Sequence, residues 1–343
     1  MSLRIGSLCS GYRGLDMAVE QVLGATTAWV SDIDPGANKI LAHHWPTVPN
    51  LGDLTAARWE DVEPVDIVCG GYPCQPFSLA GKRKGTQDER HIWPWIACAL
   101  GVLRPRIAFF ENVPGHLRLG FDTVLADLAA LGFDAEWCLV RASEVGAPHP
   151  RRRLFLLAVA ADTPHLGHER PRPARGRGYG PADHRDAPAD ARRAGLEVGR
   201  VEPDRDERQA AQRGGGESAA DAARLGRGEG RAEPARFEGR PGPPGRGASD
   251  WGRFGSAVAR WEHATGRRAP WATDDRNRLS PLFVEWLMGL DAGHVTAVPG
   301  LTRNEQLKAL GNGVVPQQAT AALRLLLDRA GWPFARVPCA DTR

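Results

Sequence analysis

Between Leu3 and Val159, short apolar runs alternate with stretches in which apolar residues recur at helical spacing. The apolar runs predict strands at residues 3–11, 25–31, 65–71, 106–112, 133–140 and 152–160, the first ending in a glycine turn. The helical spacing predicts helices at residues 15–23, 92–103 and 121–131. Strands that alternate with helices are typical of an α/β fold with a doubly wound, mainly parallel sheet, in which ligands bind at the carboxyl ends of the strands.

The pattern is lost from Thr163 to Asp250. This segment holds 17 Arg, no Lys, 15 acidic residues and two aromatic residues, with few aliphatic ones. Such a composition buries too little apolar surface to offset the conformational entropy lost on ordering. We expect residues 163–250 to form a flexible or loosely ordered insertion.

Periodicity returns at Trp251. Residues 251–270 predict one amphipathic helix, and residues 279–290 a second with Pro281 near its start. The sequence GNGVVP then predicts a glycine turn and a short extended segment, followed by a helix at 317–330. These last pieces are apolar enough to join the core of the first part of the chain.

Composition narrows the class of protein. The net charge of the 343 residues is only +3, so any nucleic-acid site must be local. We expect neither secretion nor a membrane span, because no apolar leader follows Met1 and no long apolar run occurs. Six cysteines without a CxxC pair favour a reducing cytoplasm and argue against disulfides or a zinc site.

A glycine turn and two acidic residues form a candidate nucleotide site. In SLCSGYRGLD, Gly11 and Gly14 allow close approach of the backbone to a ligand, although a tight strand-to-helix turn explains the glycines equally well. Asp32 ends the second predicted strand and suits the hydroxyl groups of a ribose. Asp53 suits an adenine amino group. Each acid taken alone also fits a solvated loop carboxylate or a helix cap.

The stretch GGYPCQPFS places Cys74 in a turn between Pro73 and Pro76, which restrict where its sulfur points. A thiol is nucleophilic only as the thiolate. A free cysteine is more often a small core residue, and that interpretation suits Cys9, Cys69, Cys98 and Cys138 better than Cys74.

A buried acid and two arginines complete the candidate chemistry. Glu111 follows the predicted strand RIAFF, where partial desolvation favours its protonated form and lets it donate to a ring nitrogen. The sequence PHPRRRLFLLA puts Arg151 and Arg153 on one face of the next strand, because side chains two positions apart share a face. They could bind a carbonyl oxygen or a phosphate, or could simply lie at a solvated strand end.

In this order, the motifs SLCSGYRGLD, SDID, GDL, GGYPCQPFSLAGKRKG, ENVPG, HPRRR, RLSPLFVEWLMG and RNEQLKALGNGVVP resemble those of the cytosine-C5 DNA methyltransferases of bacteria and phages. The likeness covers about two-thirds of the chain. It implies a Rossmann-like methyltransferase sheet, S-adenosylmethionine as cofactor and no metal. It also implies a catalytic domain split into residues 1–162 and 276–343 by a target-recognition region at 163–275.

The resemblance implies covalent catalysis on a cytosine flipped out of duplex DNA. Cys74 would add to C6 of the base, and C5 would then attack the methyl group of the cofactor. Glu111 would contact N3 and the exocyclic amine. Arg153 would hold O2, with Arg151 bracing the site.

The resemblance also assigns binding residues. The residues implied for the cofactor are Cys9, Gly11, Tyr12, Gly14, Asp32, Ile33, Asp53, Leu54, Pro73, Asn312 and Val314. Those implied for DNA lie around a loop at 79–90 with hinges at Gly81 and Gly85, and are Gln75, Ser78, Lys82, Arg83, Lys84 and Arg90.

Three positions depart from the family pattern. Arg13 stands where a second glycine is usual, Asp32 where glutamate is usual, and His149 where glutamine is usual. The shorter side chain of Asp32 would lower cofactor affinity, and His149 would loosen the support of the site.

Several alternatives stay open. A tRNA cytosine-5 methyltransferase shares these motifs, and a catalytically inactive DNA-binding relative shares the fold. A nicotinamide dehydrogenase is disfavoured, because the glycine spacing is not that of a dinucleotide fold. For the leading interpretation we expect a monomer acting on double-stranded DNA, with a cognate restriction endonuclease acting separately.

Overall fold

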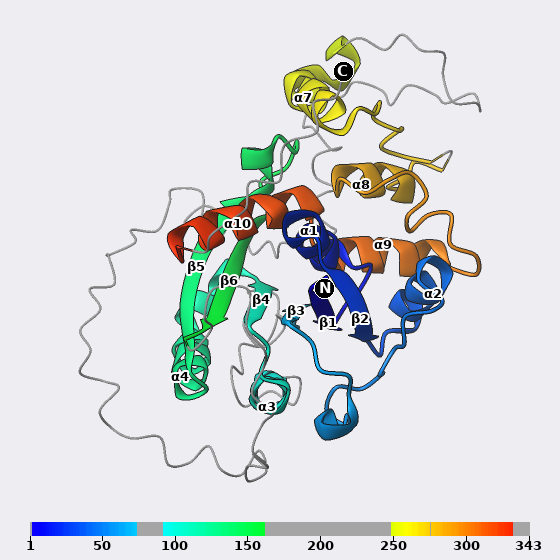
Figure 1. Cartoon of the computed structure of the whole chain (residues 1–343). Coiled ribbons are helices and arrows are strands. Elements are labelled where there is room, and N and C mark those ends of the chain that lie inside the picture. Colours follow the sequence, from blue (N-terminus) through cyan, green and yellow to red (C-terminus); the bar gives the residue numbers. More distant parts are fainter. Residues whose placement is uncertain (1, 74–91, 162–247, 275, 332–343) are drawn as a thin grey trace.

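The computed structural model describes residues 2–73, 92–161, 248–274 and 276–331 (Figure 1). Most of the expected insertion, and the predicted loop at 79–90, lie outside the described residues. No helix in the described ranges combines the length and apolar character needed to cross a membrane.

Six strands form one sheet in the order β2-β1-β3-β4-β6-β5. Their bounds are β1 (Arg4–Leu8), β2 (Thr26–Ser31), β3 (Ile67–Gly71), β4 (Ile107–Asn112), β5 (Phe133–Arg141) and β6 (Arg152–Ala160). The pairings β1–β2, β1–β3 and β3–β4 are parallel, whereas β6 runs antiparallel to both of its neighbours. The predicted doubly wound, mainly parallel sheet is confirmed.

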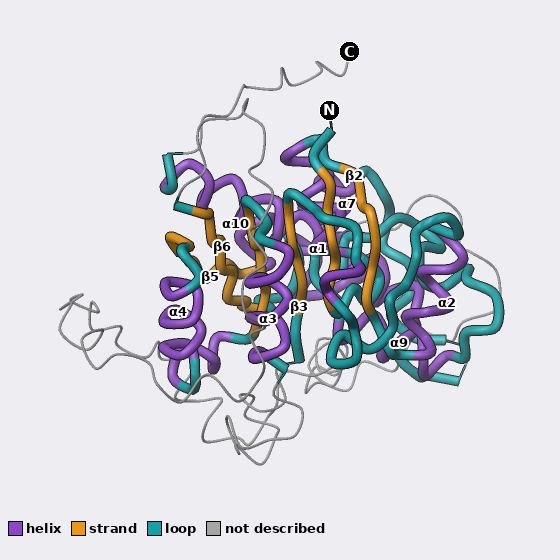
Figure 2. Tube along the Cα trace, turned by 60° about the horizontal axis from the view of Figure 1, so that its bottom comes forward, coloured by secondary structure: helices purple, strands orange, loops and turns teal. Residues whose placement is uncertain are grey.

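Helices cover both faces of the sheet (Figures 1 and 2). One face packs against α1 (Gly14–Leu23) and α10 (Pro316–Arg329), and the other against α3 (Trp93–Leu103) and α4 (Phe121–Ala130). Alternation along the strands supplies both cores, because Ile67 and Phe109 face the first pair of helices while Val68 and Phe110 face the second.

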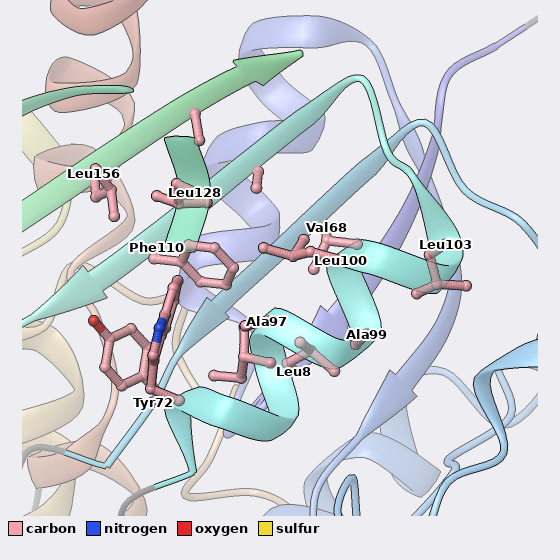
Figure 3. Close-up of a cluster of buried hydrophobic side chains, with 14 of the residues drawn as sticks. Leu8, Val68, Tyr72, Ala97, Ala99, Leu100, Leu103, Phe110, Leu128 and Leu156 are labelled. Atoms are coloured by element: carbon pink, nitrogen blue, oxygen red, sulfur yellow. The ribbon is translucent and has the colours of Figure 1, made fainter. Parts of the chain in front are cut away.

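The core beneath α3 reaches the end of β3. Figure 3 shows Ala97 and Leu100 of α3 lying over Val68 and Phe110 of the sheet, with Tyr72 at the border of this cluster. Tyr72 packs its ring against Trp93 and Phe110 at centroid distances of 5.7 and 6.0 Å. The residue that precedes Pro73 is thus anchored in the hydrophobic core.

A third cluster joins the remaining helices: α2 (Pro35–His44), α7 (Gly255–Thr265), α8 (Pro281–Leu287) and α9 (Arg303–Asn312). The rings of Trp251, Phe283 and Trp286 stack in sequence, and the Trp261 indole donates to the Trp286 carbonyl at 2.9 Å. The buried face of α7 is therefore tied to α8. Short 3₁₀ helices η1 (Trp59–Asp61), η3 (Pro114–Arg118), η4 (Ala142–Val145) and η7 (Ala248–Phe254) complete the described elements.

Two helices were not expected from apolar periodicity. The first, α2, begins after an Asp34 cap with proline in its first turn; the second, α9, begins with a capping box formed by Thr302 and Glu305. The predicted glycine turn at GNG is wrong in part, since Gly311 and Asn312 lie in the last turn of α9 and only Gly313 lies beyond it.

Candidate active site

The sheet changes its winding direction beside β1, whose neighbours are β2 on one side and β3 on the other. Ligands of open α/β sheets bind at such a switch point, outside the carboxyl ends of the strands. The glycine turn follows β1, Asp32 follows β2, and Tyr72 and Pro73 follow β3. The fold therefore brings these predicted residues to one edge of the sheet.

Glu111 lies near the end of β4, and its carboxylate forms an ion pair with Arg153, whose Nε lies 3.0 Å from Glu111 Oε1. Both side chains are buried. Burial raises the pKa of Glu111, and the nearby charges of Arg153 and Arg151 oppose that rise only in part. A carboxyl group with a raised pKa in this position can hold a proton for a ring nitrogen.

Gly71 lies directly opposite Glu111 in the β3–β4 register. A Cβ atom built at Gly71 would lie 3.2 Å from Glu111 Oε2 and 3.8 Å from Val314 Cγ2. Because Gly71 has no side chain, the Glu111 carboxyl group has room beside it. Gly71 comes three residues before Cys74 in the sequence.

The prediction that Arg151 and Arg153 share a strand face is wrong. The strand β6 begins at Arg152, and Arg151 has a φ of 25°, so the period of two does not reach it. The Arg151 guanidinium instead donates to the carbonyl oxygens of Gly311 and Gly313 at 2.9 and 2.6 Å. Arg151 thus ties the start of β6 to the end of α9.

The glycine turn and the segment after α9 are in direct contact. The Tyr12 hydroxyl donates to the Val314 carbonyl at 2.8 Å, across 302 positions of sequence. A Cβ atom at Gly313 would lie 1.8 Å from the Tyr12 ring, and one at Gly14 would lie 2.2 Å from the Val314 oxygen. Both glycines are needed for this contact. Burial, the largest influence, raises the pKa of the Tyr12 hydroxyl, which stays protonated as a donor.

Asp32 organises the turn after β1. Its carboxylate accepts from the backbone amides of Gly11 and Asp34, each at 2.8 Å. Burial raises the pKa of Asp32 although both amide bonds oppose the rise. Cys9 lies in the same turn with a φ of 52°, and burial with the nearby Asp32 charge raises the pKa of its thiol to about 12. A thiol so inert is suited to lining a pocket, not to attack.

The other residues predicted for the cofactor differ in exposure. Ile33 is 69% exposed, which is unusual for an isoleucine beside a buried strand end. Asp53 is exposed, and its carboxylate accepts from the amide and hydroxyl groups of Thr55 at 2.9 and 2.8 Å, which leaves one oxygen without a described bond. Leu54 is buried, whereas Pro73 and Asn312 are exposed.

A buried pair at this edge was not anticipated from the sequence. The hydroxyl of Tyr72 lies 2.7 Å from His116 Nε2, and His116 Nδ1 lies 2.9 Å from the Leu119 carbonyl. Because a carbonyl only accepts, Nδ1 carries the proton and Nε2 accepts from Tyr72. The contact links the end of β3 to η3, and nothing in either local sequence signals a partner 44 positions away.

The predicted nucleophile Cys74 lies outside the described residues, as do the predicted DNA-contacting residues Gln75, Ser78, Lys82, Arg83, Lys84 and Arg90. Their roles stay predictions. Within the described ranges, no group of three or more His, Cys, Asp or Glu side chains could hold a metal ion.

Curated proteins of known name resemble part of the chain. It is 31% identical over 179 residues to the type II methyltransferase M.NgoBV of Neisseria gonorrhoeae, covering 47% of this chain and 42% of that protein. It is 38% identical over 141 residues to a DNA N-6-adenine-methyltransferase of Escherichia phage P1, covering 36% of this chain and 19% of that protein. The chain thus spans less than half the length of the curated relatives it matches.

The fold resembles that of the methyltransferase EhMeth of Entamoeba histolytica, with a TM-score of 0.56, 15% identity, and coverage of 96% of this chain and 99% of that chain. The sequence profile of the C-5 cytosine-specific DNA methylases matches residues 3–182, more than half of the chain and a stretch that holds every strand of the sheet. The protein belongs to the C-5 cytosine-specific DNA methylase family.

Proposed function

We propose that the protein is a DNA (cytosine-5-)-methyltransferase that transfers a methyl group from S-adenosylmethionine to C5 of a cytosine flipped out of duplex DNA. The observation that carries the proposal is the buried Glu111–Arg153 pair, 3.0 Å apart, at the sheet edge where β3 leads into Pro73 and Cys74. An acid with a raised pKa beside a fixed guanidinium can bind the edge of a pyrimidine, which offers a ring nitrogen next to a carbonyl oxygen.

The proposed reaction uses Cys74, Glu111 and Arg153. The Cys74 thiolate adds to C6 of the cytosine and breaks the aromaticity of the ring. The Glu111 carboxyl group donates its hydrogen bond to N3, where the electron pair displaced from the ring accumulates, while Arg153 binds O2. C5 becomes nucleophilic and would bond to the methyl group, while the electron pair of the broken S–C bond stays with the sulfur, which leaves as a thioether. Loss of the C5 proton to a base and expulsion of the thiolate from C6 then restore the aromatic ring.

The edge of the sheet suits the cofactor. When bound, S-adenosylmethionine supplies an electrophilic methyl group. Gly11, with a φ of 55°, lets the backbone after β1 approach a ligand closely. The half-buried Asp32 carboxylate suits ribose hydroxyls, and exposed Ile33 suits the face of an adenine ring. We further propose that Asp53, Leu54, Pro73, Asn312 and Val314 complete this pocket with Cys9, Tyr12 and Gly14.

The domain organisation stays a proposal as well. Residues 1–162 and 276–343 would form the catalytic domain, and residues 163–275 the target-recognition region. Support comes from α10, which packs on the same sheet face as α1 although residues 163–275 separate it from the strands. The protein would act as a monomer on double-stranded DNA, with any cognate restriction endonuclease acting separately.

The test offers radiolabelled S-adenosylmethionine with duplex DNA or with tRNA to the wild type and to Cys74→Ser. We expect label in DNA with the wild type only, and a covalent adduct to a duplex that carries 5-fluorocytosine. Transfer that survives Cys74→Ser would rule out the proposed nucleophile. An inert wild type that still binds DNA would favour a catalytically inactive relative.

The labelled product separates two further candidates. Label in tRNA alone would favour the tRNA branch of the family. The likeness to a phage protein named as an adenine methyltransferase makes the modified base itself worth identifying. Digestion of the labelled DNA to nucleosides should yield labelled 5-methyl-2′-deoxycytidine. Labelled N6-methyl-2′-deoxyadenosine would contradict the proposal.

A further inference from the structure

Arg13 occupies a backbone position that disfavours every residue with a side chain. It lies between Tyr12 and Gly14 with φ 68° and ψ 26°, the left-handed region, where it caps the start of α1. Glycine is the usual residue in such a conformation, because a Cβ atom crowds the following carbonyl. A non-glycine residue persists there only when surrounding contacts hold it.

The contacts of the Arg13 side chain span three elements. Its side chain is 1% exposed; Nε lies 3.3 Å from Asp16 Oδ1, and Nη2 lies 2.6 Å from Glu20 Oε1, both on α1. Nη2 also donates to the hydroxyl of Thr27 on β2. The guanidinium carbon lies 4.1 Å from the ring centroid of Trp45, at the end of α2.

The opposite ends of these contacts are fixed as well. Asp16 accepts from the Ser7 hydroxyl at 3.0 Å, and Glu20 accepts from the Thr27 hydroxyl at 2.8 Å. Burial raises the pKa of Asp16 to about 6, and the Arg13 charge limits that rise. Because the acids are held in place, the arginine cannot move without losing charge-assisted hydrogen bonds.

The backbone held by Arg13 is the turn that would bind the cofactor. The Arg13 amide donates to the Ser10 carbonyl at 2.7 Å and closes the turn around Gly11. The Gly11 amide in turn donates to Asp32, the acid suited to a ribose. A shift of Arg13 would therefore move the Gly11 backbone and the Asp32 carboxylate together.

We propose that Arg13 is a positioning residue for S-adenosylmethionine: its guanidinium, clamped between the α1 acids and Trp45, holds the turn at residues 10–13 in its ligand-binding shape. Arg13 does not itself touch the reacting atoms. The inference rests on the proposed function, since it assigns the cofactor to this turn.

The test is the dissociation constant for S-adenosylmethionine, measured by calorimetry well below the unfolding midpoint of every variant. Arg13→Gly relieves the backbone strain but leaves Asp16 buried without its cation, and should weaken binding about tenfold. Arg13→Lys keeps the positive charge but lacks the planar guanidinium group. Its dissociation constant should lie between those of the wild type and Arg13→Gly. Arg58→Ala, which removes an arginine with an 81% exposed side chain, should bind as the wild type does.

A second variant separates positioning from simple stability. In Arg13→Gly with Asp16→Asn, no unpaired charge is buried, so the unfolding midpoint should recover while cofactor binding stays about tenfold weak. Recovery of both, or unchanged binding in Arg13→Gly, would overturn the inference and leave the proposed function standing. A wild type that binds no cofactor at all would overturn the proposed function together with the inference.

Discussion

Individual side chains at the edge of the sheet have little room to move. The Glu111 carboxyl group lies between the Arg153 guanidinium and the bare backbone of Gly71. Its position is set by an ion pair on one side and by the absence of a Cβ atom on the other. Small changes in volume here should affect chemistry before they affect folding.

The substitution Gly71→Ala tests this reasoning. Its methyl group would press on Glu111 Oε2 at 3.2 Å and displace the carboxyl group by a few tenths of an ångström. We expect methyl transfer to fall about tenfold, with the free energy of unfolding changed by less than about 1 kcal/mol. Gly101→Ala is a matched control, because its methyl group would lie 3.3 Å from Cδ2 at the end of the Leu131 side chain, far from Glu111 in the sequence. Equal rates for both variants would contradict the argument.

His149 predicts a pH dependence of stability. Its Nε2 donates to the Leu287 carbonyl at 2.9 Å, and burial, the largest influence, lowers its pKa from 6.5 to about 4. As the pH falls from about 6.5 to about 4, His149 of the unfolded chain takes up a proton that His149 of the folded protein does not, so stability is lost. Between about pH 7 and about pH 5 the wild type should lose about 2 kcal/mol more than His149→Gln in urea unfolding. Parallel pH profiles for the two proteins would contradict this.

At the scale of elements, a buried acid holds the loop that follows α8. The Glu285 carboxylate accepts from the amides of Gly293, Val295 and Thr296 and from the Thr296 hydroxyl, at 2.6 to 2.9 Å. Glu285→Gln replaces an acceptor oxygen with a donor that faces other donors. We expect a loss of about 1–3 kcal/mol in unfolding free energy. The exposed Glu136→Gln, measured alongside, should change it by less than about 0.5 kcal/mol.

Most strands of the sheet could be predicted because they contain short runs of buried apolar residues, as in the segment Ile107–Asn112. The helices α2 and α9 could not be predicted from periodicity, since few of their residues are apolar and their start signals lie in caps at Asp34 and Thr302. Element type was therefore recovered best where burial dominates, and missed where polar capping defines the helix.

The candidate site divides in the same way. The position of Glu111 could be predicted because it directly follows the apolar run of β4. A carboxylate in that position is desolvated, so its raised pKa could be expected too. The position of Arg151 was misjudged, since its carbonyl partners Gly311 and Gly313 lie 160 and 162 positions away. The Tyr72–His116 bond was missed for the same reason. Long-range contacts depend on the packing of the whole sheet and leave no local signal.

For the molecule as a whole, the two ends of the described chain meet in one core. The buried face of α10 packs with α1 against the sheet, and the Tyr12–Val314 bond joins the glycine turn to the segment just before α10. These contacts close long loops, so their formation costs conformational entropy that the shared buried core must offset. The helices after residue 276 should therefore fold together with the sheet.

Leu323→Ala tests that coupling. Leu323 is fully buried on α10 in the cluster shared with α1, so its truncation should cost about 2–5 kcal/mol. If the two parts of the chain form one cooperative unit, circular dichroism and tryptophan fluorescence should report a single coincident urea transition, shifted equally in the variant. Leu325→Ala, on the same helix but 40% exposed, should shift it little. Separate transitions, with only one displaced by Leu323→Ala, would mean that α10 folds apart from the sheet it covers.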